Sequence, residues 1–101
     1  MIARMWRGWT TPENADLYEE LLRSTVFPRI ESKQVPGYRG IELWRDEQAD
    51  EVAFVTVMRF DSLDAVKEFA GDDYEQAYVP PEARRLLSRF DERSQHYTIV
   101  K

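Results

Sequence analysis

The stretch from Val52 to Phe60 constrains the fold more than any other part of the chain, because it is apolar at nearly every position. Side chains on a β-strand point alternately to the two faces of the sheet. One face of this strand would carry Ala53, Val55 and Val57, and the other Val52, Phe54, Thr56, Met58 and Phe60. Helices can cover only one face, so the pattern predicts that a second copy of the sheet covers the other in a two-fold dimer. Burial by side chains from the chain's own loops is the alternative.

Length and charge narrow the class of protein. The 101 residues suffice for one modest core, so we expect a single domain over residues 1–101. With 19 acidic and 14 basic residues the formal net charge is −5, which argues against nucleic acid and anionic membranes as partners. The chain has no cysteine, which excludes disulfides and thiol nucleophiles. It also lacks the apolar run of a signal peptide or membrane helix, so the cytoplasm is the expected compartment.

The first part of the chain predicts a strand followed by an interrupted helix. Ile2 to Trp9 is rich in large apolar residues and ends at a helix-capping sequence, in which Thr11 caps and Pro12 takes the first helical position. Pro28 cannot donate a backbone hydrogen bond, so it should kink or split this helix near Phe27. The helix has a wide apolar face that recurs every four residues, at Tyr18, Leu22, Val26 and Ile30.

The remaining elements complete a mixed fold. Two strands joined by a polar hairpin are expected at Tyr38–Arg45 and Glu51–Phe60, and a short helix from Asp61 or Ser62 to Ala70, ended by Gly71. A further helical turn or two from Pro81 would place on one face Ala83, Leu86, Leu87 and Phe90, before a final strand at Ser94–Val100. This order predicts the α+β class with the ferredoxin-like split βαβ topology, an antiparallel sheet covered by helices on one face.

His96 is the candidate general base, because it is the only histidine and its ordinary pKa lies near neutrality. In the final strand it shares a face with Ser94 and Thr98, so its ring should lean either into the helix-side cleft or into the dimer seam. The alternative is a structural histidine that bonds a backbone carbonyl or a carboxylate.

Arginines and aromatic residues in the predicted strands supply further candidates. Arg4, Arg45 or Arg59, if turned inward, could stabilise an oxyanion, although such residues more often pair with a carboxylate. A flat aromatic ligand could lie among some of the aromatic residues, most of which we expect in the core: Trp6, Trp9, Tyr18, Trp44, Phe54 and Tyr97. No metal site is predicted, since the sequence has neither an HExxH pair nor a histidine cluster, and it also lacks a phosphate loop and a GxSxG motif.

Several short segments resemble the antibiotic biosynthesis monooxygenase-like family. They are Ile2 to Gly8, Pro36 to Gly40, Phe69 to Asp73, Asp91 to Arg93, and His96 with Tyr97. The resemblance covers essentially the whole chain and implies a dimeric α+β barrel with a ligand cleft between sheet and helices in each subunit. Quinone-forming members of the family oxidise polycyclic phenols or anthrones with dioxygen and need no metal or flavin.

The resemblance therefore implies a monooxygenase-like enzyme without a cofactor, acting on a small aromatic, ionisable molecule. His96 would be the base and Arg4 the anion stabiliser, with walls from Trp6, Tyr18, Trp44 and Phe54. A non-catalytic dimeric protein that binds a small ligand, including a stress-related one, and an isomerase or lyase-type proton shuttle are the alternatives. The haem-degrading branch uses an Asn on the first strand and a His on a later helix, whereas here Asn14 begins a helix and His96 lies on a strand.

Overall fold

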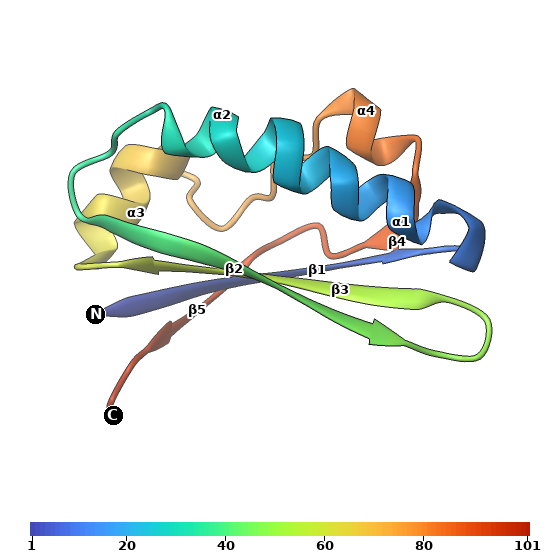
Figure 1. Ribbon diagram of the computed structural model, residues 1–101. Helices are drawn as coiled ribbons and strands as arrows, with labels where there is room; N and C mark the ends of the chain where they lie inside the picture. Colours follow the sequence, from blue (N-terminus) through green and yellow to red (C-terminus); the bar gives the residue numbers. More distant parts are fainter.

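The computed structural model describes residues 1–101 and shows an antiparallel sheet with its helices on one face (Figure 1). The strands are β1 (Ile2–Thr10), β2 (Tyr38–Glu47), β3 (Val52–Phe60), β4 (Leu87–Phe90) and β5 (Gln95–Thr98). The helices are α1 (Pro12–Leu21), η1 (Leu22–Val26), α2 (Phe27–Glu31), α3 (Leu63–Ala70) and α4 (Pro81–Arg84). The predicted α+β class and ferredoxin-like arrangement are confirmed. None of the helices is long and apolar enough to cross a membrane.

The strand order is β2-β3-β1-β4, and β5 also pairs with β1. β4 pairs with the end of β1 at Gly8–Thr10, whereas β5 pairs with its beginning at Ile2–Met5. The chain from residue 87 to 98 therefore forms one interrupted edge beside β1. The structure confirms strand pairing within the predicted last strand, Ser94–Val100, at Gln95–Thr98.

The expected helical face after Pro81 is wrong beyond the first turn. α4 ends at Arg84, and Leu87 and Phe90 lie instead on a strand. A bulge in the pairing of β4 with β1 sets Leu87 opposite Thr10 and Phe90 opposite Gly8, so these two side chains share a face although they are three residues apart. This spacing imitates a helix in the sequence.

The long helix begins where the sequence predicts, and its hydrogen-bonding pattern changes near Phe27, the predicted point of interruption. The Thr11 side chain accepts a hydrogen bond from the backbone N–H of Asn14, and Pro12 follows the cap. The Phe27 N–H bonds the carbonyl of Leu22, five residues back, which makes η1 a wide π-helical turn just before Pro28. Because Pro28 has no N–H to donate, the regular ladder cannot pass this point unchanged. The chain nevertheless keeps helical dihedrals at Val26 and Phe27, so the predicted interruption takes the form of a π-helical turn within a continuous helix.

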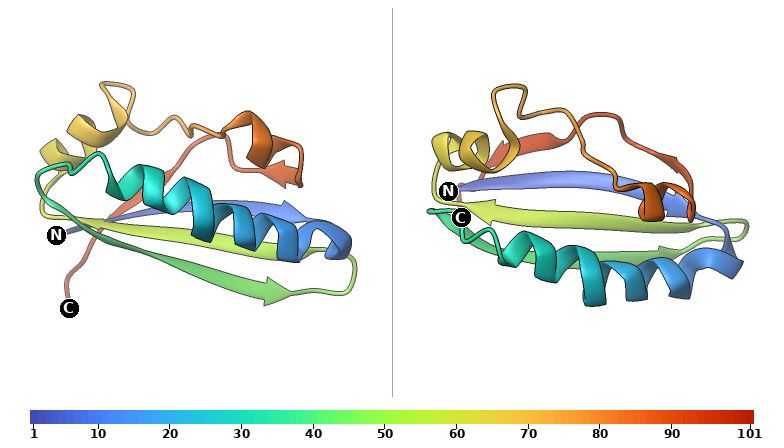
Figure 2. Two further views of the ribbon diagram at one scale, coloured as in Figure 1. Left: turned by 45° about the horizontal axis from the view of Figure 1, so that its top comes forward. Right: turned by 90° about the horizontal axis from the view of Figure 1, so that it is seen from above.

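The two faces of the sheet differ. On the helix side, Val52 and Phe54 of β3 pack with α1, and Met58 and Phe60 pack with α3. Viewed from above, α1 and α2 cross β2 and β3, while α3, the 71–80 segment and α4 lie toward β1 and the interrupted edge (Figure 2). No helix covers the opposite face (Figure 1). Of the β3 residues that alternate toward this face, Ala53 and Val55 are half-buried and Val57 is buried. The predicted dimer across this face remains a prediction.

Candidate functional site

Arg4 and His96 meet on the helix side of the sheet. They are partners in the register between β1 and β5, so their side chains leave neighbouring strands on the same face. Arg4 Nη1 lies 3.0 Å from His96 Nε2, and the same nitrogen donates to the backbone carbonyl of Tyr74 in the 71–80 segment. Of the two positions that the sequence allows for His96, the structure shows the helix side.

The chemistry of this contact defines the protonation of His96. A guanidinium nitrogen can only donate, so Nε2 must be the acceptor and the ring proton must lie on Nδ1. Nδ1 is buried and has no hydrogen-bond partner. Burial lowers the pKa of His96 below its ordinary value, and the charge of Arg4 lowers it further, while Glu75 partly opposes them. His96 is therefore a neutral imidazole at pH 7.

Arg4 is buried without a carboxylate partner. Its relative exposure is 7%, and burial lowers its pKa to about 10. The other two strand arginines considered from the sequence behave differently: Arg45 pairs with acidic residues of α1 and β2, and Arg59 pairs with Glu42. Of these three strand arginines, only Arg4 keeps a positive charge that no protein anion compensates. Such a charge is suited to stabilising an oxyanion of a ligand.

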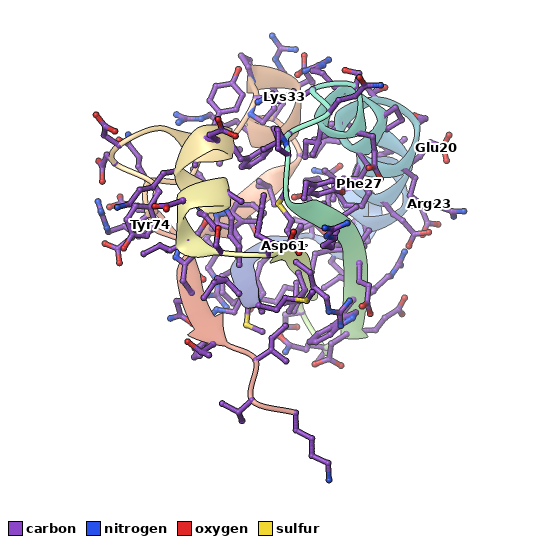
Figure 3. The ribbon with its side chains drawn as sticks, turned by 90° about the vertical axis from the view of Figure 1, so that its left-hand side faces the viewer. Glu20, Arg23, Phe27, Lys33, Asp61 and Tyr74 are labelled. Atoms are coloured by element: carbon purple, nitrogen blue, oxygen red, sulfur yellow. The ribbon has the colours of Figure 1, made fainter.

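Aromatic rings surround the pair. Arg4 Cζ lies 5.8 Å from the centre of the Phe69 ring on α3, and the Tyr74 ring meets the His96 ring edge-on at 5.1 Å. Two lysines lie over the same rings, Lys33 at 4.8 Å from Phe69 and Lys67 at 5.7 Å from Tyr74. Figure 3 shows this end of the molecule, with Tyr74 on one side of α3 and Lys33 toward the α1–α2 layer. The pair thus has both apolar and cationic surroundings.

An open cavity of about 470 Å³ reaches this site along β5. It is lined by Glu75, Arg93, Ser94, Gln95, His96 and Tyr97. Arg93 binds Asp73 at 2.9 Å and Glu75 at 3.2 Å, so the acids on this side have a cation of their own. A second cavity of about 400 Å³ lies between α1 and β2 and does not include the Arg4–His96 pair; its lining is Glu19, Arg23, Phe27, Leu43 and Arg45. In Figure 3, Phe27 and Arg23 lie on the side away from Tyr74.

The aromatic residues predicted to bind substrate are not gathered around this pair. Tyr18 and Phe54 are fully buried and pack edge-on at 5.0 Å under α1, where they build the core. Trp6 shares the helix side with Arg4, and its Nε1 donates to the carbonyl of Asp91. Trp44 is 46% exposed and hydrogen-bonds Glu42 on the opposite face of the sheet, so within one chain it cannot share a helix-side site with Arg4.

Sequence reasoning missed Phe69, Tyr74 and the two lysines as neighbours of the pair. Phe69 lies in a segment that carries the family resemblance, which was the one available signal. Tyr74 belongs to an irregular stretch without periodicity, so nothing in the sequence places it against β5.

Comparison with known proteins connects this geometry to a family. Residues 1–81 match the antibiotic biosynthesis monooxygenase family. No curated protein matches the chain by sequence.

Solved proteins with a similar fold include the following three. Rv0793 from Mycobacterium tuberculosis has a TM-score of 0.63 at 19% identity, over 99% of this chain and 95% of its own. The haem-degrader MhuD from the same organism has a TM-score of 0.60 at 16% identity, over 100% of this chain and 97% of its own. SnoaB, a cofactor-independent oxygenase from Streptomyces nogalater, has a TM-score of 0.58 at 16% identity, over 99% of this chain and 94% of its own. At these identities the likeness to solved structures shows a shared fold only. Because the family match covers residues 1–81, the chain belongs to the antibiotic biosynthesis monooxygenase family.

Proposed function

We propose that this protein is a monooxygenase-like enzyme that needs no cofactor and acts on a small aromatic, ionisable substrate, as a homodimer in the cytoplasm. The observation that carries the proposal is the contact between buried Arg4 and neutral His96 on the helix side of the sheet. Membership in the monooxygenase family supports oxidation chemistry. A shared fold with SnoaB, a cofactor-independent oxygenase, supports oxidation by dioxygen alone.

The proposed reaction converts an acidic ring CH₂ group, as in an anthrone, into a carbonyl. His96 takes one proton from this carbon, and the resulting negative charge spreads onto the ring oxygen beside Arg4. The carbon donates its electron pair to dioxygen, so a C–O bond forms and the dioxygen becomes a peroxide. Loss of the second C–H proton breaks the O–O bond, and one oxygen atom stays as the carbonyl while the other leaves as water.

The geometry prepares both residues for these roles. Because the pKa of His96 is lowered, its ring is unprotonated at neutral pH, as a base must be. Its basic nitrogen is held by Arg4 in the free protein. When the guanidinium turns to the substrate's carbonyl oxygen, on which the negative charge will develop, Nε2 becomes free to accept the proton. Deprotonation and charge stabilisation would then depend on the same movement of Arg4.

Haem as a substrate fits this site poorly. An iron ligand needs a free imidazole lone pair, but Nδ1 of the single histidine is buried and Nε2 contacts Arg4. Even if Arg4 turned away from Nε2, its uncompensated positive charge would remain close to the iron cation. Asn14 is also remote from the pair, since its side chain donates to the carbonyl of Leu86. Haem degradation, the activity of MhuD, is therefore not proposed for this protein.

Oxygen uptake with a panel of anthrones and hydroquinones tests the proposal. We expect the parent protein to consume dioxygen with at least one substrate, and His96→Ala to lower kcat by roughly 10²-fold to 10⁴-fold, the usual contribution of a general base. Tyr78→Phe is a matched control, because Tyr78 is 82% exposed and lines neither cavity, so this variant should leave the rate unchanged.

The outcomes separate the competing functions. Uptake that His96→Ala leaves intact would exclude His96 as the base. Ligand binding without turnover would favour a binding protein, and conversion of a substrate without loss of dioxygen would favour an isomerase or lyase. Each variant is compared at equal folded concentration, measured by circular dichroism.

A further inference from the structure

We propose that the Arg4–His96 site binds its substrate as an oxygen-centred organic anion, and that His96 takes up a proton when this anion binds. The inference rests on the proposed function for the location of the site, but it concerns binding rather than oxidation. The bound state contains the substrate anion and a protonated His96. It is reached either when a neutral acid binds and passes its proton to His96, or when the anion binds and His96 takes a proton from water.

Uncompensated positive charge is concentrated at this corner of the molecule. Arg4 and Lys33 both lie over the Phe69 ring, and Lys67 lies over Tyr74. None of these three cations takes part in an ion pair, whereas most other arginines of the chain do. In a chain with a net charge of −5, this gathering favours an anionic ligand.

The acidic groups near His96 do not remove this charge. Glu75 is the carboxylate whose field reaches the imidazole, and with Asp73 it is bound by Arg93. Tyr74 contributes to the site its ring and its carbonyl, which accepts from Arg4. The protein therefore supplies Arg4 with neutral acceptors only, namely a carbonyl oxygen and an imidazole nitrogen.

The contact between Arg4 and His96 links anion binding to proton uptake. A protonated imidazole has two donors and no acceptor, so it cannot keep the hydrogen bond from Arg4. Burial is the main cause of the lowered pKa of His96, and the charge of Arg4 adds to it. An anion beside Arg4 would replace this acceptor and neutralise the contribution of that charge. The pKa of His96 should therefore rise in the complex, and reciprocity requires the anion to bind more tightly as the pH falls.

The surroundings favour an aromatic anion. His96 lines the cavity of about 470 Å³, whereas Arg4, Phe69 and Tyr74 are not part of that lining. The rings of Phe69 and Tyr74 offer apolar surface beside Arg4 and His96. A carboxylate or phenolate on a ring would place its oxygen at Arg4 while the ring lies against these aromatic side chains.

Titration calorimetry with benzoate tests the inference on the whole protein. Benzoate remains ionised between about pH 5 and 8, the interval in which a histidine titrates, so any change in affinity reports on the protein. We expect the affinity of the parent to rise by up to roughly tenfold per pH unit as the pH is lowered through this interval. Titrations in buffers of different ionisation enthalpy should give different apparent binding enthalpies, which shows that a proton is taken up with benzoate. Benzamide, the neutral analogue, should bind weakly at every pH.

Three variants separate charge from proton linkage. His96→Gln keeps an acceptor for Arg4 but cannot titrate, so it should bind benzoate with an affinity independent of pH. Arg4→Gln should lose benzoate binding. Arg39→Gln removes an exposed strand arginine that pairs with Asp61, and it should behave as the parent does.

Absence of benzoate binding in the folded parent, an affinity independent of pH, or equal binding by Arg4→Gln would overturn the inference. Proton-linked benzoate binding without oxygen uptake on any substrate would retain it and reject the proposed oxidation. Oxygen uptake that depends on His96, without proton-linked binding of benzoate, would reject this inference and retain the proposed oxidation.

Discussion

Arg4 shows at the scale of one residue how structure separates a functional candidate from its look-alikes. In the sequence Arg4, Arg45 and Arg59 are equivalent, since each lies in a strand among apolar neighbours. In the fold, carboxylates reach Arg45 and Arg59, but only neutral groups reach Arg4. A buried charge without a counter-ion costs stability, and groups with perturbed pKa values are concentrated at functional sites.

His96 predicts a pH dependence of stability. Its folded-state pKa lies below the ordinary value of 6.5, so the unfolded chain takes up this proton more readily than the folded one. More than about one pH unit above 6.5 both states are almost unprotonated at this residue, and its contribution is nearly constant. As the pH falls below 6.5, the parent should lose more unfolding free energy than His96→Gln, which has no proton to gain.

Urea unfolding of both proteins between about pH 7.5 and 5, without added anion, measures this difference. Parallel losses in the two proteins would contradict the prediction, because the remaining acidic groups titrate equally in both.

At the scale of elements, local sequence signals predicted where helices begin and end better than they predicted whether a segment is a helix or a strand. The Thr11 cap, the Pro28 interruption and the Ser62 cap each act within a few residues, and all three occur as expected. The end of the chain was harder, because Leu87 and Phe90 have helical spacing but lie on a bulged strand. Their conformation depends on pairing with β1, which is nearly eighty residues away in the sequence.

The Ser62 cap provides a prediction for α3, the helix that carries Phe69. The Ser62 side chain accepts a hydrogen bond from the backbone N–H of Ala65. Ser62→Ala should therefore lower the free energy of unfolding by about 1 kcal/mol, whereas Ser62→Asp, which can also cap, should retain it. Urea denaturation checks both variants, and an equal loss in both would show that the cap hydrogen bond is not the cause.

For the whole molecule, the decisive feature is the sheet face without helices (Figure 1). Val55 lies on this face, and so do the half-exposed rings of Trp44 and Tyr97. Such a surface on a small protein favours association with a second copy. The 101 residues supply helices for one side of the sheet only.

We predict that the protein is a dimer at micromolar concentration in sedimentation analysis. Val55→Arg places a charge at the centre of the bare face and should shift the protein to monomers. Leu17→Arg changes an exposed apolar residue of α1, on the helix side, and should leave the dimer intact. A monomeric parent would refute the prediction.

The sequence by itself determined the features that rest on local chemistry and periodicity: the element order up to α3, the two-sided apolar strand β3, and the candidacy of Arg4 and His96. Only the tertiary structure decided which candidates meet. It brought Arg4 to His96 across neighbouring strands, added Tyr74 from an irregular segment, and placed Trp44 on the other face. The physical reason is that charge compensation and burial depend on contacts between groups that are far apart in the sequence. Local sequence patterns do not specify the distances in space between such groups.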